Sequence, residues 1–488
     1  MFHMSLTISK SNIFVLSLLY LLLPVCIFCL NWCNPIVAIL FSTVLLFIGL
    51  KFILSISSEK ITIGCFEFLI STILICVFLL GCGQLGFVAQ TGDNLWRNAI
   101  FHDLIEMKWP VFYGDTYLVY YFCFWLVPAY IGSVFGSWVI ANIALFIWSY
   151  IGIALTCLLL TSLSKKKSLV LFTVLFMILS GANVIGLIFT HGLDMVAYPV
   201  TFSSNEGWCD GQTNGVDSSY LMRSTWDAVA QTYNQAIPSF LVAAVALSLK
   251  TDKYNIFLFA LLFPFAPLPA VGLFLFYFIY FCFNLYDYGY RVIFKYLNII
   301  NILSAVCIIP VFGLFFKNNS DSFFGLFIPL KYFNLACFIK LLLFYFFEFV
   351  LAYCLIDKEY KRNRYVLSAL ICLLLIPLFR VGAGRDLVMN GPDFVLIVLY
   401  QFLFLSFENS LITGIRSVNK SILVYLVICS TTFLGGTYQM YRAAEQVRIA
   451  NPEITFVYYD DMKSLKNYDR SQHFFDSRHN VFYRFISK

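Results

Sequence analysis

Charged residues are scarce in this chain of 488 residues: Asp, Glu, Lys and Arg make up 12% of it, whereas 61% is hydrophobic. Aromatic residues alone account for 19%, and the mean hydropathy is +0.84. A soluble domain of this length cannot have such a composition, so that class is excluded. The apolar runs also lack the alternation of polar and apolar residues that barrel strands require. The sequence therefore predicts a bundle of transmembrane helices, which satisfies the backbone within lipid.

Other features that would point to different classes are missing as well. No small-residue cleavage site follows the first apolar run, so we expect a retained span rather than a signal peptide. No glycine-rich nucleotide-binding loop and no cytoplasmic domain is recognised, which argues against a soluble nucleotide as the direct substrate. The fifteen cysteines lie mostly inside apolar runs, with Cys209 in a polar loop, and are expected to fill apolar space.

The predicted fold is an all-α polytopic membrane protein with about 13 transmembrane helices, outer juxtamembrane helices and a small C-terminal outer tail. Pro264, Pro267 and Pro269 are expected to divide one apolar run into two short helices. The predicted spans are 12–30, 36–54, 62–82, 138–160, 168–188, 237–250, 255–266, 268–284, 296–316, 333–356, 365–380, 392–408 and 420–437.

Basic residues set the expected orientation, because Lys and Arg in short loops favour the cytoplasm. Placing the N-terminus inside gathers the Lys165–Lys167 cluster and most other loop cations on the cytoplasmic side, provided that residues 117–135 do not cross the bilayer. The net charge of +6 then reflects membrane anchoring and predicts no nucleic-acid partner. The predicted domains are a transmembrane domain over 1–437, with outer loops 83–137 and 189–236, and a periplasmic tail over 438–488.

The first outer loop contains a polar, charged segment at residues 90–115, QTGDNLWRNAIFHDLIEMKWPVFYGD. Leu95, Trp96, Ile100 and Leu104 have helical spacing and predict an amphipathic helix on the membrane surface. Asp93 and Arg97 are one turn apart, so they can face one pocket. Asp103 is ten residues beyond Asp93, about 15 Å along a helix, and is too far to act on the same atom.

This segment and two later ones resemble a known family. GDNLWRNAIFHDL, WPVFY and YLVYYFCFWLVPAYIGSVFG are similar to the first outer loop of GT-C-fold bacterial membrane glycosyltransferases, in a branch with an Asp-x-x-Lys-His-Asn-Ala-like motif. TWDAVAQTYNQAIPSFL, GAGRDLVMNGPDF and the terminal FYRFISK agree with that branch. Arg97-Asn98 stands where the branch has Lys-His, and Arg385 stands where it has Asn. The overall architecture also resembles serotype-converting O-antigen glucosyltransferases.

The resemblance implies inverting transfer of a sugar from a polyprenyl-phosphate donor to a lipid-linked or O-antigen glycan acceptor, at the periplasmic face of the bacterial inner membrane. It implies Asp93 as the catalytic carboxylate that takes the proton of the acceptor hydroxyl. Cationic side chains would stabilise the departing lipid phosphate. The predicted substrate-binding residues are Arg97, Asn98, His102, Asp103, Arg223, Gln231, Gln235, Arg385 and Asp386.

Other polar residues leave alternatives open. His102 and His191 match no metal-binding spacing, so neither a metal nor another cofactor is predicted. Lys340 and Glu348 fall inside a predicted span, where ionisable residues are functional candidates. A transporter or flippase of a lipid-linked or polar substrate is the alternative from another class, although no internal repeat supports it. An O-antigen-type polymerase would use similar outer-face chemistry.

Overall fold

The structure is a computed structural model of the chain. It describes residues 5–54, 59–86, 90, 94–114, 116–192, 208, 212–213, 216–217, 220–249, 253–317, 324–328, 334–381, 386–412, 419–433, 462, 475–477 and 480–487.

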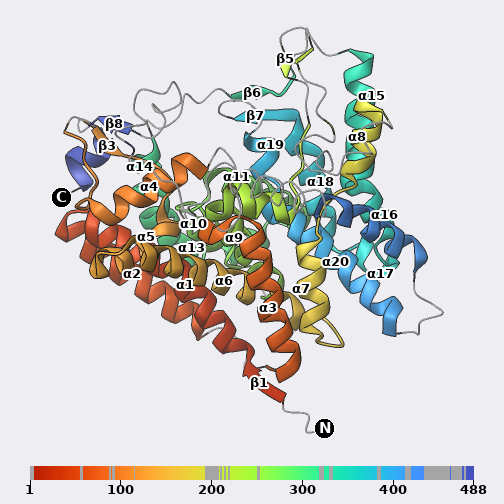
Figure 1. The fold of residues 1–488 in the computed structure, drawn as a ribbon, viewed down its shortest axis with the longest axis horizontal. Coiled ribbons are helices and arrows are strands. Elements are labelled where there is room, and N and C mark those ends of the chain that lie inside the picture. Colours follow the sequence, from red (N-terminus) through yellow and green to blue (C-terminus); the bar gives the residue numbers. More distant parts are fainter. Residues whose placement is uncertain are drawn as a thin grey trace, which may run out of the picture.

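The described part is almost entirely helical, as predicted (Figure 1). The helices are α1 (Lys10–Trp32), α2 (Pro35–Ile53), α3 (Cys65–Gly81), α4 (Asn94–Glu106), α5 (Cys123–Phe135), α6 (Trp138–Ser162), α7 (Leu169–Met177), α8 (Asn183–His191), α9 (Thr225–Ser248), α10 (Asn255–Leu262), α11 (Pro267–Tyr288), α12 (Arg291–Tyr296), α13 (Ile299–Leu303), α14 (Ile309–Phe316), α15 (Leu335–Tyr345), α16 (Leu351–Leu355), α17 (Lys358–Lys361), α18 (Arg364–Leu375), α19 (Asp386–Asn390) and α20 (Asp393–Ile412).

Short two-stranded sheets and irregular helical turns complete the fold. The strand pairs are antiparallel: β1 (Ser5–Ser9) with β2 (Lys60–Gly64), β3 (Thr116–Leu118) with β8 (Phe475–Ser477), β4 (Gln212–Thr213) with β5 (Val216–Asp217), and β6 (Phe324–Leu326) with β7 (Phe379–Val381). Turns of 3-10 helix lie at Gln84–Gly86 and Ile376–Leu378, and π-helical turns lie at Ser304–Ile308, Phe346–Val350 and Phe482–Ile486.

Several of the helices have the length and composition of membrane spans, so the chain is a multi-pass membrane protein. Among the described residues, seven stretches qualify, and four shorter apolar helices accompany them. The predicted total of about 13 spans stays a prediction. The seven are Lys10–Trp32, Pro35–Ile53, Trp138–Ser162, Pro267–Tyr288, Ile299–Phe316, Leu335–Leu355 and Asp386–Ile412, and the shorter ones are Cys65–Gly81, Cys123–Phe135, Arg364–Leu378 and Lys420–Phe433.

Helix α9 is the central element of the bundle. It is buried along nearly its whole length, packing against α6, α20, α10, α5 and α1. Its first half carries polar side chains, which explains why the span predicted at 237–250 covers only its second half. A helix surrounded by other helices does not need a uniformly apolar surface, because protein rather than lipid covers it.

One predicted feature of the apolar runs is wrong. Pro264 lies in the turn between α10 and α11, and α10 is short, but α11 is 22 residues long. Pro267 and Pro269 fall in the first turn of α11, where proline fits without loss of a helical hydrogen bond. The run is therefore divided into two helices as predicted, but the second helix is long, and Pro267 and Pro269 begin it.

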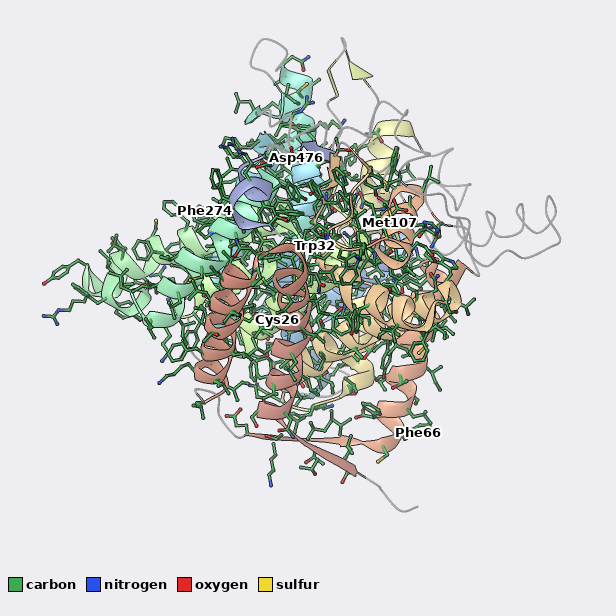
Figure 2. The ribbon with its side chains drawn as sticks, turned by 90° about the vertical axis from the view of Figure 1, so that its left-hand side faces the viewer. Cys26, Trp32, Phe66, Met107, Phe274 and Asp476 are labelled. Carbon is green, nitrogen blue, oxygen red and sulfur yellow. The ribbon has the colours of Figure 1, made fainter. Side chains whose placement is uncertain are left out.

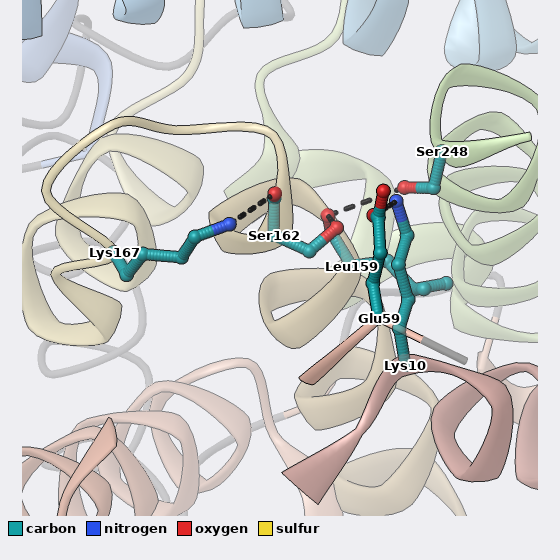
Figure 3. Close-up of polar contacts among 6 residues, drawn as sticks. All are labelled: Lys10, Glu59, Leu159, Ser162, Lys167 and Ser248. Atoms are coloured by element: carbon teal, nitrogen blue, oxygen red, sulfur yellow. Dashed lines mark hydrogen bonds and ion pairs between the residues drawn. The ribbon is translucent and has the colours of Figure 1, made fainter. Parts of the chain in front are cut away.

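The loops predicted to be cytoplasmic meet at one end of the bundle, which we call the basic end. Lys10 pairs with Glu59 at 3.7 Å, and Lys167 Nζ donates to the carbonyl of Ser162 at 2.8 Å (Figure 3). The carbonyl of Leu159 accepts from Ser162 and also from Ser248 at the end of α9. Glu408 of α20 accepts from the backbone amides of Lys165 and Lys166 at 3.0 and 2.8 Å. This clustering fits the positive-inside pattern, and the choice of membrane side stays a prediction.

The described C-terminal residues pack at the other end, which we call the loop end. Figure 2 shows Met107 and Asp476 far from Phe66, which lies beside the β1–β2 sheet. The backbone amide of Asn34, between α1 and α2, donates to the carbonyl of Ile486 at 2.7 Å. Strand β8 pairs with β3 in the loop between α4 and α5. The tail is therefore held by at least two separate segments of the bundle.

Aromatic packing reinforces this attachment. The rings of Tyr483 and Tyr117 are stacked with centroids 3.9 Å apart, and Phe482 is fully buried against Phe28 and Phe315. Burial raises the pKa of Tyr483 well above its ordinary value, so the hydroxyl stays neutral and donates to the carbonyl of Leu118 at 3.4 Å.

Candidate functional site

The candidate site is centred on an interruption of α9 at Thr232, near the loop end. Thr232 has φ −139° and ψ 41°, which lie outside the helical region. Its hydroxyl donates to the carbonyl of Ala228 at 3.1 Å and accepts from Nη1 of Arg223 at 2.7 Å. Arg223, which lies outside the helix, therefore donates a charged hydrogen bond to α9 at the residue where the helical geometry is interrupted.

Arg223 precedes α9 and is only 4% exposed. Its Nη1 also donates to Oδ1 of Asn390 at 2.7 Å, and Nη2 contacts the sulfur of Met389 at 3.7 Å. Nδ2 of Asn390 in turn donates to the carbonyl of Asp386 at 2.9 Å, which fixes the orientation of the amide. Helix α19 thus positions the guanidinium beside the α9 interruption.

A small cavity borders Arg223. The volume open to the centre of a water molecule is about 10 Å³, so the cavity has room for about one water molecule. Asp393, at the start of α20, lines the cavity and is 3% exposed. Its Oδ2 atom has no hydrogen-bond partner among the residues that the structure describes. The remaining wall is mostly apolar, formed by Leu179, Ser224, Thr225, Ala228, Phe240, Leu396 and Ile397.

A second buried guanidinium approaches α9 from α4. Arg97 is 5% exposed and acts electrostatically on Tyr233, the residue after Thr232. The hydroxyl of Tyr233 accepts from Nε1 of Trp125 in α5 at 3.0 Å. One turn earlier on α4, Nδ2 of Asn94 donates to the carbonyl of Ala230 in α9 at 3.1 Å. Arg97 and Arg223 therefore both lie beside the α9 interruption.

Helix α4 exists where the sequence predicts a helix, but other parts of the protein cover both of its faces, and its predicted place at the membrane surface stays a prediction. Asn94, Arg97 and Asn98 are buried, and so are Ile100 and Leu104. The apolar face packs in the core while the polar face contacts α9 and nearby loops. Spacing identifies two faces of a helix but cannot show that neighbouring elements cover both of them.

The other predicted residues of the first loop have structural partners. Nδ2 of Asn98 donates to Oε1 of Gln90 at 2.6 Å. The carboxylate of Asp103 contacts His102 Nδ1 at 3.1 Å, the Tyr113 hydroxyl at 2.6 Å and the backbone amide of Met462 at 3.0 Å. Asp103 thus connects α4 to the following loop and to the C-terminal region. The role of these residues in substrate binding stays a prediction.

The interruption of α9 separates Gln231 from Gln235, which the sequence places one helical turn apart. Gln231 is half-buried, whereas Gln235 is 2% exposed. Oε1 of Gln235 and both side-chain polar atoms of Asn234 have no hydrogen-bond partner within the described part of the chain. Buried amides of this kind are suited to a polar ligand or to water, because an unpaired buried polar atom costs free energy.

The predicted catalytic residue Asp93 and the predicted binding residue Arg385 lie outside the described residues. Asp386 begins α19, and its carbonyl holds Asn390. The structure thus brings Arg97, Arg223 and Gln235 close to one interruption of α9, while His102 and Asp103 belong to the contact between α4 and the tail.

Sequence reasoning missed Thr232, Asn390 and Asp393 as site residues. The last two belong to the motif GAGRDLVMNGPDF, so a signal for them was present. Thr232 carried no signal, because its role depends on a backbone conformation. Within the described part of the chain, no three His, Cys, Asp or Glu side chains are grouped closely enough to hold a metal ion.

The arrangement suits recognition of an anion. A guanidinium presents donors in a planar fork that matches phosphate oxygens, and burial strengthens its attraction to negative charge. No family profile, no curated protein and no solved structure matches this chain. The likeness to membrane glycosyltransferases therefore rests on the resemblance of the sequence alone.

Proposed function

We propose that this protein is a membrane glycosyltransferase, which transfers a sugar from a polyprenyl-phosphate donor to a lipid-linked or O-antigen glycan acceptor with inversion at the anomeric carbon. The observation that supports this proposal is the placement of two buried guanidinium groups, Arg97 and Arg223, beside the α9 interruption at the end of the bundle opposite the basic end. The active site would face the periplasm of the bacterial inner membrane.

The reaction would use these groups in a defined way. The oxygen of an acceptor hydroxyl forms a bond to the anomeric carbon, and the bond from that carbon to the phosphate oxygen breaks. The electron pair of the broken bond leaves with the polyprenyl phosphate, whose growing negative charge Arg97 and Arg223 would stabilise. No metal or other cofactor is part of the proposal.

The proton of the acceptor hydroxyl would pass to a carboxylate. The family resemblance points to Asp93, and Asp393 is a second candidate because it lines the cavity beside Arg223. Paired variants, Asp93→Asn and Asp393→Asn, would separate the two roles. The variant that removes the general base is expected to lose sugar transfer while keeping donor binding, since neither substitution removes a cation.

The donor's lipid chain needs contact with the bilayer near the site. At the corner between α5 and α6, Val134, Phe135 and Val139 are exposed and apolar. Val134 and Phe135 end α5, the helix that carries Trp125 near its start, and Val139 is in the first turn of α6. We propose this corner as the place where the prenyl chain lies.

Mass spectrometry of the O-polysaccharide tests the proposal. We expect cells that carry the wild type to add a hexose mass, and cells that carry Arg223→Lys to lose most of it, because a lysine cannot replace the two-acceptor geometry of Arg223. Arg364→Lys is the matched control, since Arg364 pairs with Asp287 at 2.7 Å, away from the α9 interruption. Equal modification by both variants would contradict the assigned site. A wild type that modifies no glycan, and that releases no sugar from polyprenyl-phosphate donors when purified, would contradict the function.

A transporter is the second candidate, because one observation favours it. The chain between α7 and α8 leaves helical geometry beside the fully buried carboxyl group of Glu348. Interrupted helices and intramembrane carboxyls recur in transporters. Movement of labelled substrate across vesicles, unchanged by Arg223→Lys, would favour this candidate. Lengthened rather than decorated O-polysaccharide would instead indicate a polymerase.

A further inference from the structure

The sequence predicts one continuous span over residues 168–188, and this prediction is wrong. Helix α7 ends at Met177, and α8 begins at Asn183. Between them, the carbonyl of Leu179 accepts from the backbone amide of Thr225 at 2.9 Å, and the amide of Ala182 donates to the carbonyl of Phe347 at 3.4 Å. Backbone hydrogen bonds to α9 on one side, and to the helix that carries Glu348 on the other, therefore hold the chain between α7 and α8 in a non-helical conformation.

Glu348 lies in the π-helical turn Phe346–Val350, inside the apolar stretch Leu335–Leu355. It is fully buried, and its Oε1 accepts from Nε1 of Trp208 at 2.6 Å. Its Oε2 packs against Gly181 so closely that a methyl group at Gly181 would overlap it. The carboxyl group thus faces the interruption between α7 and α8, and a π turn in a helix often marks a functional position.

Three buried oxygen atoms in this region have no hydrogen-bond partner among the described residues: Oε2 of Glu348, Oγ of Ser180 and Oδ1 of Asn183. Their residues are at most 1% exposed. Nearby hydroxyl groups are already engaged, because Tyr400 donates to the carbonyl of Ser180 at 2.6 Å and contacts the Tyr425 hydroxyl at 2.8 Å. Leaving three buried oxygens unsatisfied is costly, so the region is suited to a ligand that accepts their lone pairs.

We propose that the interruption between α7 and α8 is a binding site for sodium ion, with oxygen ligands from Glu348, Ser180 and Asn183. Carboxylate, hydroxyl and amide oxygens are the ligands that hard cations take. Unwound helix segments coordinate Na⁺ in other membrane proteins. The site is separate from the cavity beside Arg223 and Asp393, because Glu348, Ser180 and Asn183 do not line that cavity.

Charge and size select a small monovalent ion. One carboxylate provides one negative charge, so a bound Na⁺ leaves a neutral site, whereas a divalent ion would leave a buried net charge. Oε2 of Glu348 already occupies the place of a side chain at Gly181, and all three oxygens are buried, which favours a small ion over a larger one. Sodium binding would stabilise the folded state, because an ion that binds only the folded protein shifts the unfolding equilibrium.

The test is thermal unfolding of the full-length protein in detergent micelles, followed by tryptophan fluorescence. The salts are NaCl, KCl and N-methylglucamine chloride at equal ionic strength. We expect Na⁺ to raise the midpoint temperature of unfolding by several degrees, with a response that saturates as the Na⁺ concentration rises. The midpoints in the other two salts should be lower than the midpoint in NaCl. Glu348→Gln is expected to raise the Na⁺ concentration for half of the shift by about tenfold or more, because the variant lacks the charge.

Ser180→Ala provides a milder variant that removes one ligand without disturbing the carboxyl group, and it should also weaken the Na⁺ response. Ser304→Ala is its matched control, since the Ser304 hydroxyl is equally buried in a helix but already donates to the carbonyl of Ile300 at 2.7 Å. Equal midpoints in the three salts would overturn the proposal. So would a wild-type Na⁺ response in both Glu348→Gln and Ser180→Ala, or a midpoint that depends on pH but not on Na⁺, which would mean that Glu348 binds a proton instead.

Discussion

Gly272 in α11 and Gly391 in the turn before α20 touch through their backbones. A methyl group at Gly272 would overlap the carbonyl oxygen of Gly391. This close approach lets α11 support the turn that follows Asn390, the residue that holds Arg223. A small residue on one helix thereby contributes to the position of a side chain on another segment.

Gly272→Ala is therefore expected to destabilise the protein by about 1–3 kcal/mol, because the added methyl forces α11 away from the turn. Gly313→Ala is the control, since Gly313 also lies in an apolar helix but has no atom within 4 Å of an added methyl. The control should be neutral or up to about 1 kcal/mol more stable, owing to the higher helix propensity of alanine. Unfolding by denaturing detergent measures both, and equal stability of the two variants would contradict the expected contact.

Thr232→Val is expected to cost about 1.5–3 kcal/mol, the range for a hydrogen bond to a charged group, because Arg223 loses one acceptor. Thr156→Val makes a close comparison. Both hydroxyls are buried and donate to a carbonyl four residues earlier, Thr156 to Gly152 at 2.8 Å, but only Thr232 is bonded to an arginine. Thermal unfolding should therefore show a clearly larger loss of stability for Thr232→Val than for Thr156→Val. An equal or smaller loss would mean that the hydrogen bond from Arg223 does not contribute to stability.

Phe482→Ala is expected to lower stability by about 3–5 kcal/mol, as for other fully buried aromatic side chains. The loss should also release the described C-terminal residues from the bundle, which limited proteolysis would detect. Phe485→Ala, three residues later, replaces a side chain that is 67% exposed and should change stability by about 0.5 kcal/mol or less. If proteolysis cleaves both variants alike, the attachment does not depend on the buried ring.

Orientation is tested with cysteines placed at the two ends. Lys166 and Lys108 are both exposed, the first at the basic end and the second after α4. In intact spheroplasts, a membrane-impermeant maleimide should label Lys108→Cys, whereas Lys166→Cys should react only after permeabilisation. The parent chain supplies the background from native cysteines such as Cys282 and Cys354, which are exposed. The reverse pattern would place the basic end in the periplasm.

Much of the fold could be predicted from the sequence, because an apolar run of membrane-spanning length has few structural alternatives to a transmembrane helix. The helices near 12–30, 36–54 and 138–160 agree with α1, α2 and α6 to within a few residues. Where the expectations failed, neighbours decided the outcome. The prolines at 267 and 269 begin α11 instead of breaking it, and the run at 168–188 is divided because α9 and the Glu348 helix bind its middle.

The candidate site was predicted less completely. The charged loop and the GAGRDLVMNGPDF motif both supply residues beside α9, and Arg97 and Arg223 were identified from sequence. Asn390 and Thr232 were not, since an asparagine in a short helix and a threonine within a long helix are common. Their importance depends on one guanidinium that bonds to both at 2.7 Å.

The sequence by itself determined that this is a multi-pass helical membrane protein with its basic loops at one end, because hydropathy and charge placement act on each segment separately. The tertiary structure alone decided which polar groups share an environment. It buried both faces of α4, opened α9 at Thr232 beside two arginines, and set Glu348 against the gap between α7 and α8. Those contacts join segments far apart along the chain, and packing between helices rather than local sequence determines them.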